Sequence, residues 1–236
     1  MKKRKAPKAV LFDMDGVLID SMPMHVAAWS RIYKEYGIDL TEEYLYSEEG
    51  RVATKAIEKL FKEQKGIELS EEETLKIHSQ KADHIKSQAR PPRMDGMLEF
   101  VQLVRETSAT SVVTGSGQAT LINTLNDYYP ACFDETKMVS ARDVKYGKPH
   151  PEPYLMGLKK HGIKAGEAIV VENAPLGTLA GNAAGIFVLA INSGKLTNNI
   201  LYENGADVVL NSVNELVDWW KININQSAPL NSKSGY

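Results

Sequence analysis

The stretch from Lys8 to Asp20 reads Lys-Ala-Val-Leu-Phe-Asp-Met-Asp-Gly-Val-Leu-Ile-Asp. Its first part, residues 9–12, is apolar without a break, which is typical of a strand that is buried on both faces of a parallel sheet. Asp13 and Asp15 follow directly, and Gly16 permits a sharp turn after them. Because open α/β sheets bind ligands at the carboxyl ends of their strands, these two carboxylates are predicted to lie at a binding site.

Two neighbouring carboxylates at the end of a buried strand repel each other and lose hydration, and both effects cost free energy. A hard cation with oxygen ligands, usually Mg²⁺ beside a phosphate, removes both costs. The alternative interpretation is an ordinary Asp-Gly turn after a strand. The D-x-D-G pattern favours phosphoryl chemistry over this alternative, and the remaining motifs of the chain test that preference.

Length and composition limit the remaining possibilities. A chain of 236 residues holds one large domain, or a core with a smaller insertion, and we expect a monomer. The net charge of −2 gives no reason to expect nucleic acid or a membrane as a partner. The single cysteine, Cys132, excludes an internal disulfide and favours a reducing cytoplasm. The basic residues 1–5 lack a following signal-type apolar run and are expected to form a solvated tail, and the polar residues from Lys221 onward are expected to fray.

Residues 24–90 show helical spacing and no strand signal. The predicted helices are Met24–Tyr36, a short one after Thr41, one over Val52–Phe61, and one from the capping box of Ser70 and Glu73 to Ser87. Pro91, Pro92 and Gly96 then interrupt the helical pattern.

From Met97 onward, helix and strand patterns alternate. The predicted strands are 111–114, 138–140, 168–171, 187–191 and 208–210, and the predicted helices are 97–106, 119–125, 151–161, 175–184 and 213–220. This alternation predicts an α/β fold with a doubly wound parallel sheet. We therefore predict a core domain of residues 1–20 and 95–236. An inserted all-helical cap domain of residues 21–94 is joined to it by two hinge linkers and lies over the active site.

Three further motifs are candidates for the same site, of which two follow predicted strands and one precedes a predicted helix. Thr114, Gly115 and Ser116 offer a hydroxyl and loop N–H groups that suit phosphate oxygens, although the same residues also suit a plain turn. Lys148 suits a contact with both a carboxylate and a phosphate, the alternative being a solvated lysine in a Pro-rich loop. The pair Glu172 and Asn173 follows a predicted buried strand. Glu172 lies 24 residues after Lys148, a separation that suits one helix and one strand between them.

Together, the D-x-D-G, T-G-S, G-K-P-x-P-x-x-Y and E-N-A-P-L-G runs resemble the four motifs of the haloacid dehalogenase (HAD) superfamily. Ser21, His25, Ala28 and Trp29 add a resemblance to the branch that includes β-phosphoglucomutase. The resemblance implies that Asp13 is the nucleophile, that Asp15 is the general acid/base, and that Thr114 and Lys148 are catalytic. It also implies Mg²⁺ held by Asp13, Asp15 and Glu172. Asn173 stands where the family usually has Asp, and it keeps a carbonyl oxygen for the metal but lacks the charge.

The predicted cap supplies the residues expected to choose the substrate. His25 follows the first linker, and its alternative role is that of a half-buried helix residue. Arg51 resembles an arginine in the cap loop of β-phosphoglucomutase and is expected to contact phosphate, whereas Glu48 is expected to be a solvated carboxylate. Glu49-Gly50-Arg51 with the E-N-A-P-L-G run resembles the Bacteroides-type HAD inorganic pyrophosphatases. In that comparison Glu49 is a metal and substrate ligand when the cap is closed.

The sequence thus predicts a Mg²⁺-dependent HAD phosphohydrolase that acts through an aspartyl phosphate on a small phosphorylated substrate. Pyrophosphate is the leading expectation, and β-phosphoglucomutase or a sugar-phosphate phosphatase is the alternative. A response-regulator receiver domain fits poorly, because its phosphorylated Asp ends the third strand and no helical insertion follows its first. A catalytically inactive HAD scaffold fits less well than an enzyme, because Asp13, Asp15, Thr114, Lys148 and Glu172 are all present.

Overall fold

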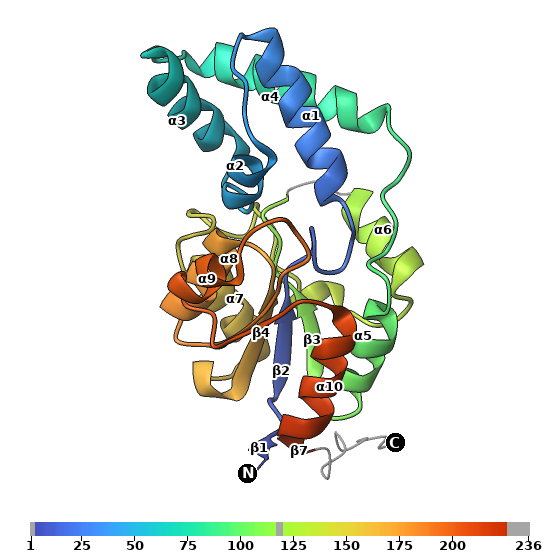
Figure 1. The fold of residues 1–236 in the computed structure, drawn as a ribbon. Helices are drawn as coiled ribbons and strands as arrows, with labels where there is room; N and C mark the ends of the chain where they lie inside the picture. Colours follow the sequence, from blue (N-terminus) through green and yellow to red (C-terminus); the bar gives the residue numbers. More distant parts are fainter. Residues whose placement is uncertain (1–2, 117–119, 226–236) are drawn as a thin grey trace.

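The computed structural model of the chain describes residues 3–116 and 120–225. Its centre is a five-stranded sheet in the order β3-β2-β4-β5-β6, in which all neighbouring strands are parallel (Figure 1). The strands are β2 (Ala9–Phe12), β3 (Ala109–Val112), β4 (Ala168–Glu172), β5 (Phe187–Ile191) and β6 (Val208–Leu210). Phe12 pairs with Val112 on one side and Val171 on the other, so three strands end at the same level. The predicted α/β fold with a parallel sheet is confirmed.

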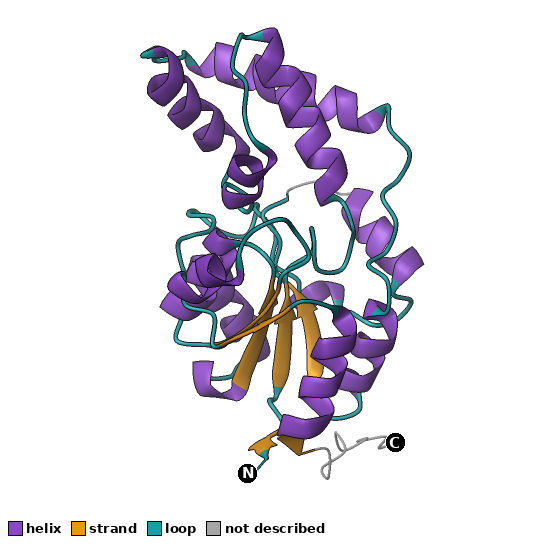
Figure 2. Ribbon diagram, in the orientation of Figure 1, coloured by secondary structure: helices purple, strands orange, loops and turns teal. Residues whose placement is uncertain are grey.

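Helices cover both faces of this sheet (Figure 2). The faces are fixed by the alternation of side chains along β2, because successive residues of a strand point to opposite sides. Val10 and Phe12 join a core with Phe100 and Trp220, whereas Leu11 joins a core on the other face. The helices of this α/β part are α5 (Met97–Arg105), α6 (Thr120–Tyr128), α7 (Glu152–His161), α8 (Pro175–Ala183), α9 (Asn198–Glu203) and α10 (Val213–Asn223), with short 3₁₀ turns Glu135–Lys137 and Ala165–Glu167.

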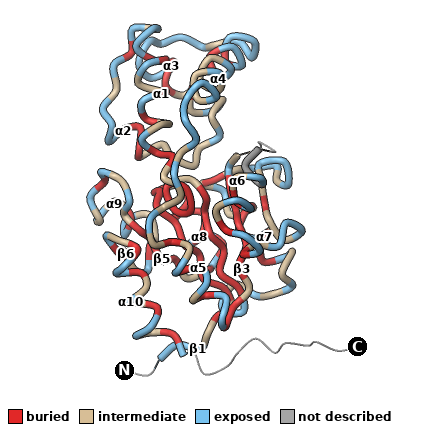
Figure 3. The backbone as a smooth tube through the Cα atoms, turned by 90° about the vertical axis from the view of Figure 1, so that its right-hand side faces the viewer, coloured by how far each residue is buried: buried red, intermediate tan, exposed pale blue. Residues whose placement is uncertain are grey.

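Four helices between β2 and α5 form a separate layer above the carboxyl ends of the strands (Figures 1 and 3). They are α1 (Met22–Glu35), α2 (Glu42–Ser47), α3 (Ala53–Lys65) and α4 (Glu71–Lys86). They bury a core of their own, which includes Ile32, Ile57, Leu60, Phe61 and Ile77. The predicted capping box is present at α4, where Ser70 and Glu73 bond reciprocally.

The helical layer joins the rest of the chain through two segments that run side by side. Asp20 N donates to Pro92 O at 2.9 Å, and Met94 N donates to Leu18 O at 3.0 Å. Away from these linkers, Lys195 Nζ lies 2.6 Å from Glu42 Oε2, so the loop after β5 also contacts the cap. The domain limits 1–20, 21–94 and 95–236 stay a prediction, and α1 to α4 lie within the predicted cap range.

Several local predictions were wrong. Residues 138–140 form no strand, because Val139 makes only an isolated bridge to Val113. The first strand after the cap is Ala109–Val112, two residues earlier than expected. The helix α9 was not expected from the sequence. The predicted start of a helix at Ala119 lies outside the described residues.

Both chain ends were expected to be loose, and the described parts of both are paired. Arg4–Lys5 (β1) and Ile224–Asn225 (β7) form a two-stranded parallel sheet. The Arg4 guanidinium also lies 3.8 Å from the centre of the Phe187 ring. Ile224 is fully buried and so attaches this end of the chain to the core, which its polar sequence neighbours did not suggest.

Among the described residues, no helix combines the length and apolar character needed to cross a membrane.

Candidate active site

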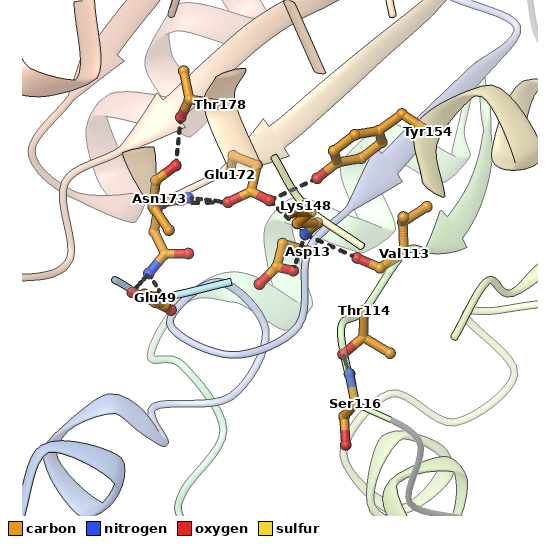
Figure 4. A network of polar contacts seen from close by, with 11 residues as sticks. Asp13, Glu49, Val113, Thr114, Ser116, Lys148, Tyr154, Glu172, Asn173 and Thr178 are labelled. Atoms are coloured by element: carbon orange, nitrogen blue, oxygen red, sulfur yellow. Dashed lines mark hydrogen bonds and ion pairs between the residues drawn. The ribbon is translucent and has the colours of Figure 1, made fainter. Parts of the chain in front are cut away.

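The predicted site residues meet where β2, β3 and β4 end (Figure 4). Asp13 follows β2, and its backbone N donates to Val171 O at 2.9 Å. Glu172 is the last residue of β4, and Lys148 reaches the same place from the loop before α7. The structure therefore brings together three residues that are separated by up to 159 positions in the chain.

Lys148 is the centre of this group. Its Nζ donates to Asp13 Oδ1, to Glu172 Oε1 at 2.6 Å and to Val113 O at 3.2 Å. The ammonium has three protons, so each is used in one of these contacts. The residue is only 3% exposed. Burial alone would lower the pKa of Lys148, but the charges of Asp13 and Glu172 outweigh burial and raise it. Lys148 is thus a buried cation paired with two carboxylates, and not a solvated lysine.

Glu172 accepts four hydrogen bonds. Its Oε1 accepts from Lys148 Nζ and from Tyr154 OH at 2.7 Å. Its Oε2 accepts from the backbone N–H groups of Asn173 at 3.0 Å and Ala174 at 3.2 Å. A carboxylate has about four acceptor positions, so this one is filled by protein donors. In this arrangement Glu172 anchors Lys148, a role that differs from the metal-ligand role expected from the family resemblance.

Asp13 lies against the Lys148 ammonium, with Glu172 and Asp15 nearby. Burial raises the pKa of Asp13 to about 8, against the lowering effect of Lys148, and the charges of Glu172 and Asp15 add to the rise. The carboxylate is therefore held in a place where its negative charge is costly until a further cation or a reacting group arrives.

Asp15 has a different set of partners. Ser21 Oγ donates to Asp15 Oδ1 at 2.5 Å, and His25 Nε2 lies 3.5 Å from the same oxygen. The other ring nitrogen of His25 lies 2.8 Å from Lys81 Nζ of α4. Burial alone would raise the pKa of Asp15, but the contacts with His25 and Ser21 outweigh it and lower the pKa. His25 on α1 therefore contacts the predicted acid/base, Asp15, which the alternative role of a half-buried helix residue did not include.

Glu49 reaches from the cap to the core. Asn173 Nδ2 donates to both carboxylate oxygens of Glu49 at 2.9 Å (Figure 4). Burial, partly opposed by the Asn173 hydrogen bond, raises the pKa of Glu49 well above its usual range, and the charges of Asp13 and Glu172 add to this. Gly16 permits this approach, because a Cβ at its positive φ of 76° would stand 2.1 Å from Asn173 Nδ2.

The oxygen atoms at this edge fit a hard cation such as Mg²⁺. Asn173 Oδ1 is buried and has no hydrogen-bond partner in the described part of the chain. Such an orphaned acceptor beside Asp13 is costly unless a cation or water completes it. Asp13, the Asp15 carbonyl and Asn173 would hold the ion, with Glu49 near them. Within residues 3–116 and 120–225, however, no three His, Cys, Asp or Glu side chains are grouped as a ready metal site, because Lys148 lies between Asp13 and Glu172.

Of the remaining predicted residues, some line the cavity and others are engaged with neighbouring groups of the protein. Gly115 and Ser116 line the cavity beside Asp13, while Thr114 Oγ1 accepts a hydrogen bond from Ser116 N at 3.0 Å and so shapes the loop. The expectation that Glu48 is solvated was wrong. Its side chain is 15% exposed, and it accepts from Arg51 Nε and, at 2.6 Å, from Lys59 Nζ. Arg51 lines the cavity but is already paired with this carboxylate, which the sequence could not show because the pairing depends on the turn between α2 and α3.

Three residues of the site were missed by the sequence analysis. Tyr154 stands inside the recognised G-K-P-x-P-x-x-Y run, and the run itself was the signal that could have assigned it to the site. Ser21 was noted only for the family resemblance. Lys81 had no signal, because it lies 56 residues from its partner His25 and the contact depends on how α1 packs against α4.

One cavity of about 660 Å³ connects these groups. Asp13, Asp15 and Lys148 lie at its core end, and the cap supplies its other walls. The cap residues reach far from the strand ends and include His25, Trp29, Tyr33, Tyr44, Leu60 and Lys81. The site is thus a pocket between the core and the cap, with carboxylates and a buried cation at its base.

The comparisons with known proteins agree with this geometry. The haloacid dehalogenase-like hydrolase family model matches residues 10–191, and the chain belongs to this family. It is an enzyme of the phosphatase and phosphomutase type within that family. Hexitol phosphatase A of Escherichia coli is 29% identical over 209 residues, which cover 89% of this chain and 93% of that protein.

Two further relatives point the same way. A phosphorylated carbohydrates phosphatase of Thermotoga maritima is 29% identical over 194 residues, covering 80% of this chain and 88% of that protein. A solved structure from Bacteroides vulgatus, provisionally assigned as a beta-phosphoglucomutase, is 44% identical with a TM-score of 0.86. It covers 91% of this chain and 88% of that one. These relatives favour phosphorylated carbohydrates over the leading expectation of pyrophosphate.

Proposed function

We propose that this protein hydrolyses the phosphate ester of small phosphorylated sugars or sugar alcohols, as a cytoplasmic monomer. The observation that carries the proposal is the cavity of about 660 Å³ between the Asp13–Lys148 group and the cap. Pockets of roughly 300–1,000 Å³ enclose drug-sized ligands, so a phosphate group alone would leave most of this space unfilled. The names of the hexitol and carbohydrate phosphatases among the relatives support the same substrate class.

The cap side of the cavity suits a hydroxylated leaving group. His25, Trp29 and Tyr33 are spaced four residues apart along α1 and therefore share one face of that helix. At 1.5 Å per residue this row is roughly 12 Å long, beginning at the His25 contact with Asp15. Aromatic rings that carry polar atoms offer both an apolar surface and hydrogen bonds, as a sugar or polyol requires.

The proposed reaction has two halves. Asp13 attacks phosphorus and forms an aspartyl phosphate, while the leaving-group oxygen takes a proton from Asp15. Asp15 then removes a proton from water, which attacks phosphorus and releases Asp13. Lys148 stabilises the negative charge of the Asp13 carboxylate and of the phosphate oxygens near it. A bound Mg²⁺ would supply further charge stabilisation for the transferring phosphoryl group.

The ionisation of Asp15 fits its two proposed roles, as an acid in the first half of the reaction and as a base in the second. Its lowered pKa keeps it ionised before substrate arrives, which suits the base of the second half. A phosphate group brings negative charge next to it, and like charges raise the pKa of a carboxyl group. Substrate binding therefore favours the protonated form that the first half needs.

A screen of phosphate release tests this proposal. The purified protein is assayed with a hexitol 6-phosphate, glucose 6-phosphate, glycerol 1-phosphate and pyrophosphate at equal Mg²⁺ concentration. We expect the highest kcat/KM with a hexose or hexitol phosphate. A highest value with pyrophosphate would contradict the proposal, and conversion of glucose 1-phosphate to glucose 6-phosphate faster than phosphate release would indicate a mutase.

Pyrophosphate remains a second candidate because of one specific observation, the contact of Glu49 with Asn173. Asn173 has one negative charge fewer than Asp, so a highly charged substrate is repelled less at this edge. Glu49 would return that charge only while the cap is closed and a cation beside it favours the ionised carboxylate.

The variant Glu49→Ala separates the two candidates. If pyrophosphate is the substrate, we expect its turnover to fall about 10- to 100-fold and the Mg²⁺ requirement to rise, the usual cost of losing a residue that supports a metal site. If a sugar phosphate is the substrate, its turnover is expected to change little or to improve, because truncation widens the cavity. The measurement is steady-state kinetics on both substrates across a Mg²⁺ titration.

Glu42→Ala is the matched control for this variant. It removes another cap carboxylate that contacts the core, through Lys195 at 2.6 Å, but does not touch the site. An equal loss in both variants would show that the effect comes from cap closure and not from a role of Glu49 at the site.

A further inference from the structure

Tyr154 contacts the carboxylate of Glu172 from inside the α/β core. It is completely buried on the first turns of α7, in the core cluster that contains Leu11 and Val113. Its hydroxyl donates to Glu172 Oε1 at 2.7 Å (Figure 4). Its ring centre lies 5.1 Å from Lys148 Nζ. The residue does not line the cavity, so it has no direct contact with a substrate there.

Tyr154 begins a chain of contacts that ends at Asp13. The hydroxyl holds Glu172 Oε1, the same oxygen holds Lys148 Nζ, and Lys148 holds Asp13 Oδ1. The other oxygen of Glu172 is fixed by two backbone N–H groups. A phenol has an ordinary pKa of about 10, so the hydroxyl carries a proton at neutral pH and acts as the donor to this carboxylate. Each oxygen of the Glu172 carboxylate therefore has two donors. These four hydrogen bonds fix the orientation of the carboxylate relative to the Lys148 ammonium.

We propose that Tyr154 is a positioning residue, which fixes Glu172 and through it sets the Lys148 ammonium on the nucleophile. The inference rests on the proposed function only in taking Asp13 as the nucleophile, and it is independent of the leaving group. Without the hydroxyl, Glu172 Oε1 would keep a single donor and would draw Lys148 closer to itself. The ammonium would then be less well placed to stabilise Asp13 and the transferring phosphoryl group, where small displacements reduce rate strongly.

Tyr154→Phe removes the hydroxyl and keeps the ring that fills the core. We expect kcat to fall about 10- to 100-fold, the typical cost of losing an outer partner of an active-site ligand, with KM nearly unchanged. The control is Thr110→Val, which also deletes a buried hydroxyl, one that donates to Cys132 O away from the site. Both variants are expected to lose some stability in urea unfolding, and only Tyr154→Phe is expected to lose kcat. A wild-type kcat in Tyr154→Phe would overturn the inference.

A double-mutant cycle tests whether the effect passes through Glu172. We expect Tyr154→Phe to lower kcat less than twofold when it is added to Glu172→Gln, because the residues act as one unit. Independent, multiplicative losses would show that Tyr154 acts by another route and would also overturn the inference.

The parallel assay of Asp13→Asn keeps the two proposals apart. If that variant stays active the proposed function fails, whereas an inactive Asp13→Asn with an unaffected Tyr154→Phe contradicts the positioning role alone.

Discussion

Asp13→Asn is expected to abolish phosphate release from every substrate of this protein, by at least about 10⁴-fold, because an amide cannot form the acyl phosphate. Asp13 is the carboxylate that Lys148 contacts at the end of β2, and none of the neighbouring acids can replace it there. Glu172 is filled by four donors, and Asp15 is held by Ser21 and His25. The measurement is phosphate release by the purified variant, and turnover near the wild-type level would contradict the assignment.

The same variant is expected to keep the fold, and its stability should depend on pH in a defined direction. The pKa of Asp13 is about 8 in the folded protein against an ordinary value of 3.8, so its contribution to stability is present below pH 3.8 and is lost as pH rises through 8. Asn does not titrate. The free energy of unfolding of Asp13→Asn, relative to wild type, should therefore be higher at pH 8 than at pH 5, which urea unfolding at the two pH values measures.

Lys148→Met is expected to damage both stability and activity. The substitution keeps much of the side-chain volume but leaves Asp13 and Glu172 as two buried carboxylates without their shared cation. Removing one partner of a buried ion pair typically costs about 3–5 kcal/mol of unfolding free energy, because the other charge remains buried. Turnover should fall at least about 10³-fold, since the charge next to the nucleophile is lost.

A second substitution separates the two effects of Lys148→Met. The double variant Lys148→Met/Glu172→Gln also removes one of the abandoned charges, and it should recover a large part of the lost stability without recovering turnover. Urea unfolding and phosphate release on the single and double variants are the measurements. Wild-type stability of Lys148→Met would show that the buried ammonium is not what neutralises the two carboxylates.

Much of the fold was predictable because it depends on local patterns. The apolar run of residues 9–12 is the buried interior strand β2, and the capping box at Ser70 and Glu73 begins α4 as expected. The strand predicted at 138–140 failed, because a short apolar segment becomes a strand only when a neighbouring strand offers continuous pairing, and Val139 finds one bridge. The paired chain ends also escaped prediction, because β1 and β7 are only two residues long and need each other.

For the site, the sequence by itself determined which residue types are available, since Asp13, Lys148 and Glu172 each lie within a recognisable motif. Only the tertiary structure decided what each of them touches. Glu172 is saturated by Lys148, Tyr154 and two backbone N–H groups, and Glu49 reaches Asn173 across 124 residues. The physical reason is that a motif fixes a side chain's place along one strand, whereas hydrogen bonds and burial depend on the loops and helices that long-range packing brings beside it.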